Sequence, residues 1–391
     1  MEFISRTSTG TDQEQILHEL CKDVEGEFDL GVLFVAPNQQ TLMADLVRDL
    51  KETLKLKNLL GCTCAGIIGT DAEIERQTAA TLTLLRLPGV KVTPFTLNQA
   101  QLEGLKTKDE WYSFFEIFPN ENPTFLALPD PFLFDINRFL SGLNQAYSGC
   151  PVMGGLASSA SGPGENTLVI NSETRDDGVV GVALTGNLHI ETIVSQGCKP
   201  IGHTYIVTKA EDNFIHTLAG KPFLEVLQDA LKKLPSSDQL LAQEAIFVGI
   251  AMDEYKDEFK RGDFLIRGLM GIDPQTNAGV IADFVKTGQT VQFHLRDAKT
   301  ATEDLRELLA WKQKQNPNQR PKGALVFCCN GRGEYLFRQK NHDIKLIQQH
   351  LGPIPAGGFF CAGEIGPVGG HNFLHGFTNS IALFYPLKMN T

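Results

Sequence analysis

The sequence lacks any long apolar run and any large cluster of basic residues. No stretch approaches the roughly 18 consecutive apolar residues that a membrane-spanning helix needs, and residues 1–6 do not open a secretory signal. The net charge is −11 and no basic cluster is longer than Lys312–Lys314, so the positive surface that phosphate contacts require is missing. We therefore expect a cytoplasmic protein that binds neither membranes nor nucleic acid.

The motifs of several common enzyme classes are also missing. There is no Gly-x-Ser-x-Gly elbow, no Walker phosphate loop, no His-Glu-x-x-His pair and no clean Gly-x-Gly-x-x-Gly after the first apolar run. We expect a non-enzymatic protein without catalytic residues. The alternative is a thiol-dependent enzyme of unrecognised class, with Cys329 or Cys361 as an activated thiolate. The hydroxyl of Ser158 is a further candidate nucleophile.

Cysteine is sparse, with eight residues in a chain of 391. This number fits reduced thiols in a reducing compartment better than a disulfide scaffold. Cys62 and Cys64 are separated by one residue, and Cys328 and Cys329 are adjacent, so neither pair has the two-residue separation of a zinc knuckle. The cysteines therefore predict no metal site.

The histidines leave one cofactor open. His371 and His375 stand four apart, but the glycines on both sides disfavour the helix that would align them for a metal. No Cys-x-x-Cys-His motif for covalent haem is present. We expect no cofactor. The alternative is a haem-binding sensor of a gas such as nitric oxide, because a non-covalent haem held by one histidine leaves little trace in a sequence. The candidate haem ligands are His375, His294 and His203.

The sequence does contain a repeated pattern. A short apolar run at 31–36 leads through a segment of helical spacing to the loop Cys62–Gly69, and a run at 323–327 leads in the same way to Cys361–Gly370. Strand, helix, strand and glycine loop is the order of a βαβ unit, which presents ligand sites at the carboxyl ends of its parallel strands. These two loops are the first candidates for a site.

A third copy of the pattern lies between these two. Residues 125–129 and 152–157 are predicted strands, and apolar spacing predicts a helix over 133–146. The loop after them, 158–164, is rich in serine and glycine. It is either a flexible surface turn or a site where backbone N–H groups bind an anion.

The middle of the chain changes to antiparallel patterns. Apolar runs at 178–184 and 188–194 flank Gly186-Asn187, which predicts a hairpin. A helix is predicted over 222–234. Further strands are predicted at 246–250, 264–267, 279–282 and 290–294. The predicted fold is α/β with α+β character: two related lobes, built by internal duplication, with mixed sheets, βαβ units and antiparallel strands.

Several separated motifs together resemble one family, the FIST proteins. The motifs in the C-terminal half are Asp263–Asp273, Val291–Asp297, Asn330–Gly333, Gly357–Pro367 and His375–Thr378, and the N-terminal half contributes Gly61–Gly66. The resemblance implies an N-terminal FIST domain over residues 28–218 and a C-terminal FIST domain over residues 219–386.

The resemblance also implies a function. FIST proteins are expected to be sensory modules of signal transduction that bind amino acids or similar small metabolites, and some members bind haem. No kinase, cyclase or DNA-binding segment accompanies the two regions here. A separate signalling protein is therefore the expected partner, and a cleft between the lobes is the expected ligand site.

The C-terminal loops provide the predicted ligand contacts. Arg332, between two glycines after an apolar run, is suited to hold an acidic group, because a guanidinium forms paired hydrogen bonds. Glu364 is suited to accept from an amino group and His375 to add a hydrogen bond. The alternative is a purely structural salt bridge between Arg332 and Glu364. The remaining predicted contacts are Gly333, Gly363 and Gly366 for close backbone approach, Cys329 and Cys361 in the same loops, and Cys62, Cys64 and Gly66 as an opposing wall.

Overall fold

The computed structural model describes residues 1–36, 40–244, 246–317 and 319–386. They form two compact units. Unit 1 comprises Met1–Val194, Leu305–Leu374 and the segment from Thr378 onward, and unit 2 comprises Ser195–Asp304 and His375–Phe377. The predicted division of the chain between residues 218 and 219 stays a prediction about family regions. In the part of the chain that the structure describes, none of the helices combines the length and apolar character that crossing a bilayer requires.

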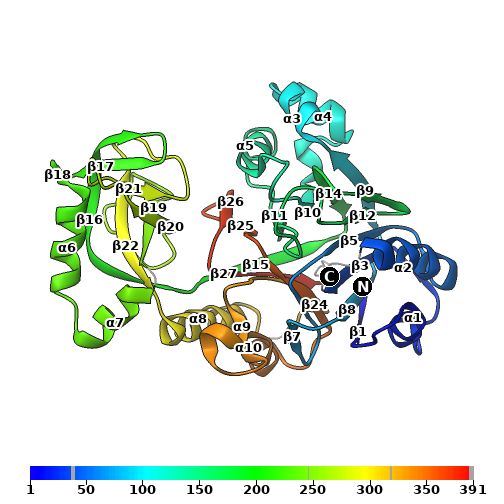
Figure 1. Ribbon diagram of the computed structural model, residues 1–391. Helices are drawn as coiled ribbons and strands as arrows, with labels where there is room; N and C mark the ends of the chain where they lie inside the picture. The colour runs from blue at the N-terminus through cyan, green and yellow to red at the C-terminus, as the bar shows by residue number, and fades with distance from the viewer. Residues whose placement is uncertain (37–39, 245, 318, 387–391) are drawn as a thin grey trace. The chain divides into compact units, whose positions relative to one another are not determined.

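Unit 1 contains three six-stranded mixed sheets with the same internal order (Figure 1). Sheet 1 runs β1 (Glu2–Ser8), β8 (Ala79–Arg86), β3 (Leu30–Ala36), β5 (Leu59–Thr63), β12 (Leu168–Ile170), β13 (Glu173–Arg175). Sheet 2 runs β9 (Val90–Leu97), β14 (Val179–Gly186), β10 (Thr124–Pro129), β11 (Val152–Gly155), β25 (Glu364–Val368), β26 (His371–His375). Sheet 3 runs β15 (His189–Gln196), β27 (Thr378–Tyr385), β23 (Gly323–Cys329), β24 (Ala356–Cys361), β6 (Gly66–Ile68), β7 (Glu73–Glu75).

The three predicted copies are confirmed by three parallel strand pairs. β3 pairs with β5, β10 with β11, and β23 with β24. The connecting helices are α2 (Gln40–Thr53), α5 (Ile136–Ala146) and α10 (His342–Leu351). We name the copies repeat 1 (residues 2–86), repeat 2 (90–186) and repeat 3 (189–385), and unit 2 is an insertion in repeat 3.

Each repeat gives its hairpin to another repeat. Hairpin β6–β7 of repeat 1 extends sheet 3 beside β24, hairpin β12–β13 of repeat 2 extends sheet 1 beside β5, and hairpin β25–β26 of repeat 3 extends sheet 2 beside β11. All three exchanged pairings are antiparallel. The exchange is cyclic, so no repeat completes a sheet from its own strands.

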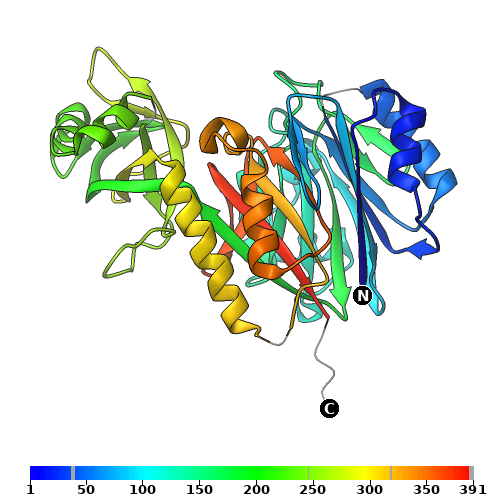
Figure 2. The same cartoon turned by 90° about the horizontal axis from the view of Figure 1, so that it is seen from below.

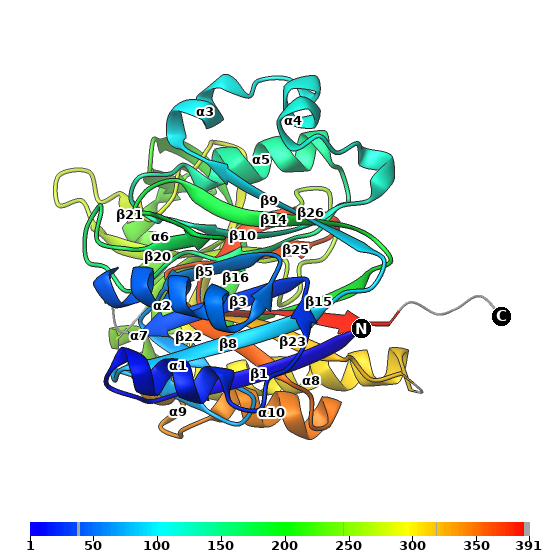
Figure 3. The same cartoon turned by 90° about the vertical axis from the view of Figure 1, so that its right-hand side faces the viewer.

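Helices cover the outer face of every sheet. Helices α1 (Gln13–Cys21) and α2 accompany sheet 1, while α3 (Gln99–Gly104), α4 (Lys108–Phe115) and α5 accompany sheet 2 (Figure 3). Helices α8 (Ala298–Gln315) and α10 lie along sheet 3 (Figure 2). Their apolar faces explain this placement: α5, for example, buries Phe139, Leu140 and Leu143 at helical spacing.

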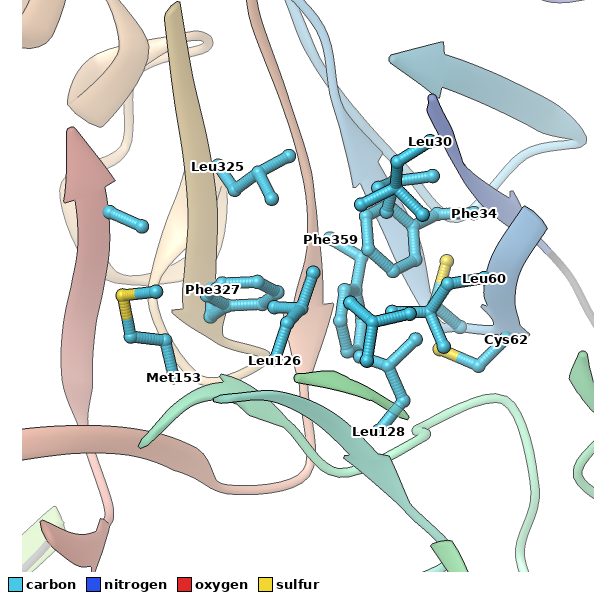
Figure 4. Packing of buried hydrophobic residues seen from close by; sticks show 14 of the residues in the cluster. Leu30, Phe34, Leu60, Cys62, Leu126, Leu128, Met153, Leu325, Phe327 and Phe359 are labelled. Atoms are coloured by element: carbon cyan, nitrogen blue, oxygen red, sulfur yellow. The ribbon is translucent and has the colours of Figure 1, made fainter. Parts of the chain in front are cut away.

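The inner faces of the three sheets share one core. Phe34 of sheet 1, Leu126 of sheet 2 and Phe327 and Phe359 of sheet 3 point into it (Figure 4). The ring centroids of Phe34 and Phe359 lie 4.5 Å apart. Because strands of the parallel pairs are covered on both faces, they read as nearly unbroken apolar runs, which is why they were visible in the sequence.

The predicted hairpin at Gly186-Asn187 is wrong. β14 already has β10 on one edge and β9 on the other, so it has no edge left for β15. β15 instead pairs with β27 in sheet 3. The turn is a link between sheets, held where the N–H of Asn187 donates to the carbonyl of Gly89, 2.8 Å away.

Unit 2 is a closed antiparallel barrel. Its ring consists of β16 (Cys198–Glu211), β22 (Thr290–Arg296), β19 (Ile246–Ala251), β20 (Phe264–Ile272), β21 (Gly279–Ile281), β17 (Phe214–Leu218) and back to β16. Helices α6 (Phe223–Lys232) and α7 (Ser236–Glu244) accompany it. This confirms the antiparallel strands that were predicted for the second half, and α6 lies within the predicted helix 222–234.

One glycine recurs at the same place in each repeat. A Cβ atom added to Gly61, Gly154 or Gly358 would overlap the carbonyl oxygen of Leu33, Ala127 or Val326, respectively, on the neighbouring parallel strand.

We expect alanine at Gly358 to destabilise unit 1 by about 1–3 kcal/mol, as overpacking usually does. Gly104, with no atom within 4 Å of an added Cβ, provides the control, for which little change is expected. Denaturant unfolding would measure both, and equal stability of the two variants would contradict the prediction.

Candidate functional site

The three glycine loops meet at the carboxyl ends of the parallel pairs. The hydroxyl of Ser158, after β11, accepts from the N–H of Ala65, after β5, over 3.0 Å and donates to the carbonyl of Phe360 in β24. The N–H of Leu156 donates to the carbonyl of Gly363, 2.9 Å away. Ser158 therefore bonds the loops of repeats 1 and 2 to strand β24 of repeat 3, a structural role that occupies its hydroxyl.

The backbone N–H groups of the serine- and glycine-rich loop 158–164 that could bind an anion donate instead to side chains just after the loop. The N–H groups of Ser161 and Gly162 donate to the Glu165 carboxylate over 3.0 and 3.1 Å, and the N–H of Ala160 donates to the Asn166 side chain over 3.1 Å. An external anion would have to displace these groups. The loop is therefore a self-bonded turn in this structure.

Cysteines from repeats 1 and 3 line the central core. Cys62, Cys64 and Cys361 are fully buried there. Burial raises the pKa of the Cys62 and Cys361 thiols well above the ordinary range. Because the thiolate is the reactive form, these cysteines are packing residues rather than activated nucleophiles.

A buried ion pair lies after β23. Arg332 and Asp343, which stands at the start of α10, are 0% and 2% exposed. Nε of Arg332 donates to Oδ2 of Asp343 over 2.8 Å, and Nη2 donates to Oδ1 over 3.2 Å. This paired geometry is the strongest that a guanidinium and a carboxylate form. The short helix α9 (Gly333–Phe337) adds the ring of Phe337, 5.2 Å from Cζ of Arg332.

The Asp343 carboxylate has further polar neighbours. Asn379 of β27 donates from Nδ2 over 2.9 Å, Nδ1 of His342 lies 2.8 Å from Oδ1, and the Cys328 thiol lies 3.6 Å from Oδ2. Burial alone would raise the pKa of the Asp343 carboxyl, but the charge of Arg332 together with the hydrogen bonds from His342 and Arg332 outweighs burial and holds that pKa well below its usual range. Asp343 is therefore an anion in the folded protein.

Glu73 brings the exchanged hairpin to this ion pair. It opens β7, is 9% exposed, and its Oε1 accepts from the N–H of Ile344 over 2.7 Å. Burial raises the pKa of Glu73 to about 8, and the negative charge of Asp343 acts in the same direction. Oε2 of Glu73 and Nη1 of Arg332 are buried with no hydrogen-bond partner in the described part of the chain. We name the set Arg332, Asp343, Glu73, His342 and Asn379 the Arg332 cluster.

A pocket opens beside the cluster. It has a volume of about 300 Å³ and lies between the β6–β7 turn and α10. Thr70 and Asp71 form one wall and Ile344, Lys345 and Gln348 the other, with Gln349 and Pro353 completing the lining. Nε2 of Gln348 clamps the turn by donating to the carbonyl of Thr70 over 2.7 Å. We name this the junction pocket, because its walls come from repeats 1 and 3.

The two charged residues that were predicted to bind the ligand lie apart from each other. Arg332 pairs with Asp343, so the alternative of a salt bridge between Arg332 and Glu364 is wrong. A carboxylate oxygen of Glu364 accepts instead from the N–H of Thr378 over 3.1 Å, and Glu364 is fully buried. Gly333 has φ +68° and follows Arg332 directly.

The other predicted residues serve packing and turns. A Cβ atom added to Gly66 would meet Ile74 and Phe360, and one added to Gly366 would meet Ser380 and Val194. Cys329 accepts from the N–H of Gly331 over 3.4 Å. A direct ligand contact by any of these residues stays a prediction.

The candidate haem ligands lie in unit 2 and differ in exposure. His375 is 2% exposed, His203 is exposed, and His294 is 2% exposed beside the Phe264 ring, with centroids 5.3 Å apart. Burial lowers the pKa of His294 to about 4, so it is neutral at physiological pH. His371 and His375 lie on strand β26 rather than on a helix. Among the described residues no three His, Cys, Asp or Glu side chains form a group that could hold a metal ion.

Asp343 and Glu73 were not singled out from the sequence. Asp343 is an acidic residue in the first turn of α10. In a βαβ unit the helix begins next to the carboxyl end of the first strand, so this residue could have been noticed as a candidate. Glu73 is 270 positions from Asp343 and belongs to another repeat, so only the exchanged hairpin brings it there. No local pattern reports such a contact.

Comparisons with known proteins identify the family. The sequence matches the FIST N domain over residues 29–221 and the FIST C domain over residues 224–367. The chain belongs to the FIST family, whose domains are associated with signal transduction and small-ligand sensing rather than catalysis. The uncharacterized protein Rv0628c of Mycobacterium tuberculosis is 38% identical over 355 residues, which are 91% of each chain. The uncharacterized protein Mb0898c of Mycobacterium bovis is 36% identical over 356 residues, which are 91% of this chain and 90% of that protein.

The buried ion pair predicts a coupled pair of substitutions. We expect Arg332→Met to cost about 3–5 kcal/mol, because Asp343 then stays buried without its cation. Adding Asp343→Leu should recover part of this loss, since the double variant leaves no uncompensated charge. Denaturant unfolding of both single variants and the double variant would measure the coupling. Additive effects would contradict a direct interaction.

The central cysteines predict resistance to alkylation. We expect Cys62, Cys64 and Cys361 to remain unmodified by iodoacetamide in the folded protein at pH 8 and to react after denaturation, because burial keeps them as inaccessible thiols. Peptide mass spectrometry would locate the modified positions. Rapid labelling of Cys361 in the folded protein would instead support the thiol-dependent enzyme.

Proposed function

We propose that this protein is a sensory module of signal transduction that binds an amino acid or a related small metabolite in the junction pocket. The observation that carries the proposal is the pocket itself. Its walls come from the FIST N and FIST C regions, and its volume of about 300 Å³ suits a small ligand. A ligand there would contact both regions at once.

Opposite charges on the two walls support a ligand that carries both signs. Asp71 lies on the FIST N wall and Lys345 on the FIST C wall, and both are exposed. A carboxylate suits an ammonium group, and a lysine suits an acidic group. Ile344 and Pro353 add apolar surface for the body of the ligand. Amino acids have this combination of groups.

The walls are held before any ligand arrives. Oγ1 of Thr70 accepts from the N–H of Ala356 over 3.1 Å, and Gln348 bonds both Thr70 and Ile354. The N–H of Ile344, on the pocket wall, donates to Glu73 of the Arg332 cluster. In this proposal the Arg332 cluster fixes the position of Ile344 in the pocket wall through this bond. Preformed walls lower the ordering cost of binding.

A ligand in the junction pocket would couple its binding to signalling. A ligand that contacts the turn and α10 together stabilises the attachment of the FIST N hairpin to the FIST C region, because a ligand favours the state that it binds. A separate protein that distinguishes the attached hairpin from a loosened one would then sense occupancy. Such a partner is the expected next component.

A thermal-shift screen tests the proposal. The purified protein would be heated with each of the common amino acids and with small organic acids, since a ligand at 100 times its Kd stabilises by about 2.7 kcal/mol. We expect a zwitterionic compound to raise the melting temperature. We expect Asp71→Asn and Lys345→Gln to reduce that shift, because each removes one of the two charged contacts.

Matched controls keep the charge changes comparable. Asp257→Asn and Lys340→Gln remove the same charges at exposed positions outside the pocket and should leave the shift intact. A shift that survives both pocket variants would contradict the proposed site. A Soret band after incubation with haem, lost in His375→Ala, would instead favour the haem-based sensor.

A further inference from the structure

The two strands of the β6–β7 hairpin are attached to the FIST C region in different ways: β6 pairs with β24, whereas β7 is held by side-chain bonds of Glu73 and Glu75. Glu73 donates from its N–H to the Asn341 side chain over 2.8 Å and accepts from the N–H of Ile344 over 2.7 Å. Glu75 adds one bond, from the N–H of Glu334 over 2.8 Å. Strand β7 is the edge of sheet 3 and pairs only with β6. Its position on α9 and α10 therefore depends on these side-chain bonds.

The charges around Glu73 oppose its ionisation. The titratable or charged groups that act on Glu73 are Glu75 on its own strand, Cys328 of β23, Arg332 after β23 and Asp343 of α10. Behind them, His342 contacts Asp343, and Glu334 of α9 contacts Glu75. Arg332 is already paired with Asp343. A second buried carboxylate beside Asp343 would have no cation of its own, which is a costly arrangement.

We propose that Glu73 is a proton-operated latch: its neutral form holds strand β7 on α10, and loss of its proton opens the hairpin by releasing β7, while β6 stays paired with β24. Asp71 lies in the turn just before β7, so release of β7 loosens the part of the junction-pocket wall that Asp71 forms, whereas Thr70 stays bonded to Gln348 and Ala356. The effect on ligand binding rests on the proposed function, whereas the latch itself does not. The proton leaves to solvent when the hairpin opens and returns when it closes.

The direction of the pH effect follows from the two states. In the open hairpin Glu73 is solvated and ionises near the ordinary pKa of glutamic acid, about 4.3. In the closed hairpin burial and Asp343 raise the pKa of Glu73 to about 8. The latch is complete below the lower value and weakens as the pH rises toward the upper one. The opening constant should rise up to about tenfold per pH unit in this window and level off above it.

Hydrogen exchange of the full-length protein tests the latch. Peptides that cover residues 66–75 would be followed by mass spectrometry at pH 5.5, 6.5, 7.5 and 8.5 and corrected for the intrinsic exchange rate. We expect the wild-type opening constant to rise by about tenfold per unit up to pH 7.5. The Glu73→Gln variant should show no such rise, because its amide keeps the acceptor for Ile344 without a titrating proton.

Repeat 2 offers a matched control. Glu173 opens β13 as Glu73 opens β7, since Ile170 pairs with Glu173 and Ile68 pairs with Glu73. Glu173 is exposed, so Glu173→Gln should show the wild-type pH dependence. Exchange in peptides from α5 would report whether the variants remain folded.

Two results would overturn the latch: a wild-type opening constant that does not change with pH, or the same rise in the Glu73→Gln variant. The outcome is separable from that of the ligand screen. If no compound binds but the pH-dependent opening is lost in Glu73→Gln, the latch stands and the junction pocket has another role.

Discussion

The exchange of hairpins between repeats is the constraint on which unit 1 depends. A parallel strand pair has two open edges, and its outer backbone groups must find partners. In each repeat one edge is closed by the return strand, and the other is closed by a hairpin from a different repeat. A single repeat would therefore expose both an unpaired strand and a detached hairpin. The three repeats stabilise one another around a shared core.

The same exchange explains how one scaffold supports different chemistry. The glycine that admits the neighbouring carbonyl recurs as Gly61, Gly154 and Gly358, so the backbone is alike in the three repeats. The side chains around it are not. Glu73 meets a buried arginine and aspartate, whereas its counterpart Glu173 is exposed. Repetition builds the frame, and because both hairpins begin their second strand with glutamate, it is the buried arginine and aspartate of repeat 3 that give the junction at Glu73 its charges.

A buried ion pair is weak support for stability, because removing two charges from water costs several kcal/mol. The pair Arg332–Asp343 nevertheless has the paired bonds, the amide donor and the ring contact that reduce this cost. Its position is informative. It lies where strands and helix ends of repeat 3 meet a hairpin of repeat 1, so it ties two family regions together. In the proposed function, this connection joins the two walls of the junction pocket.

The three βαβ units, the antiparallel character of the second half and the family could all be predicted from the sequence. These follow from apolar periodicity, glycine loops and ordered motifs, all of which are local along the chain. Tertiary structure alone decided the partner of Arg332, the place of β15 and the arrival of Glu73 at the cluster. Each depends on which strand edges are already occupied. That is a property of the assembled sheets, and no segment carries it alone.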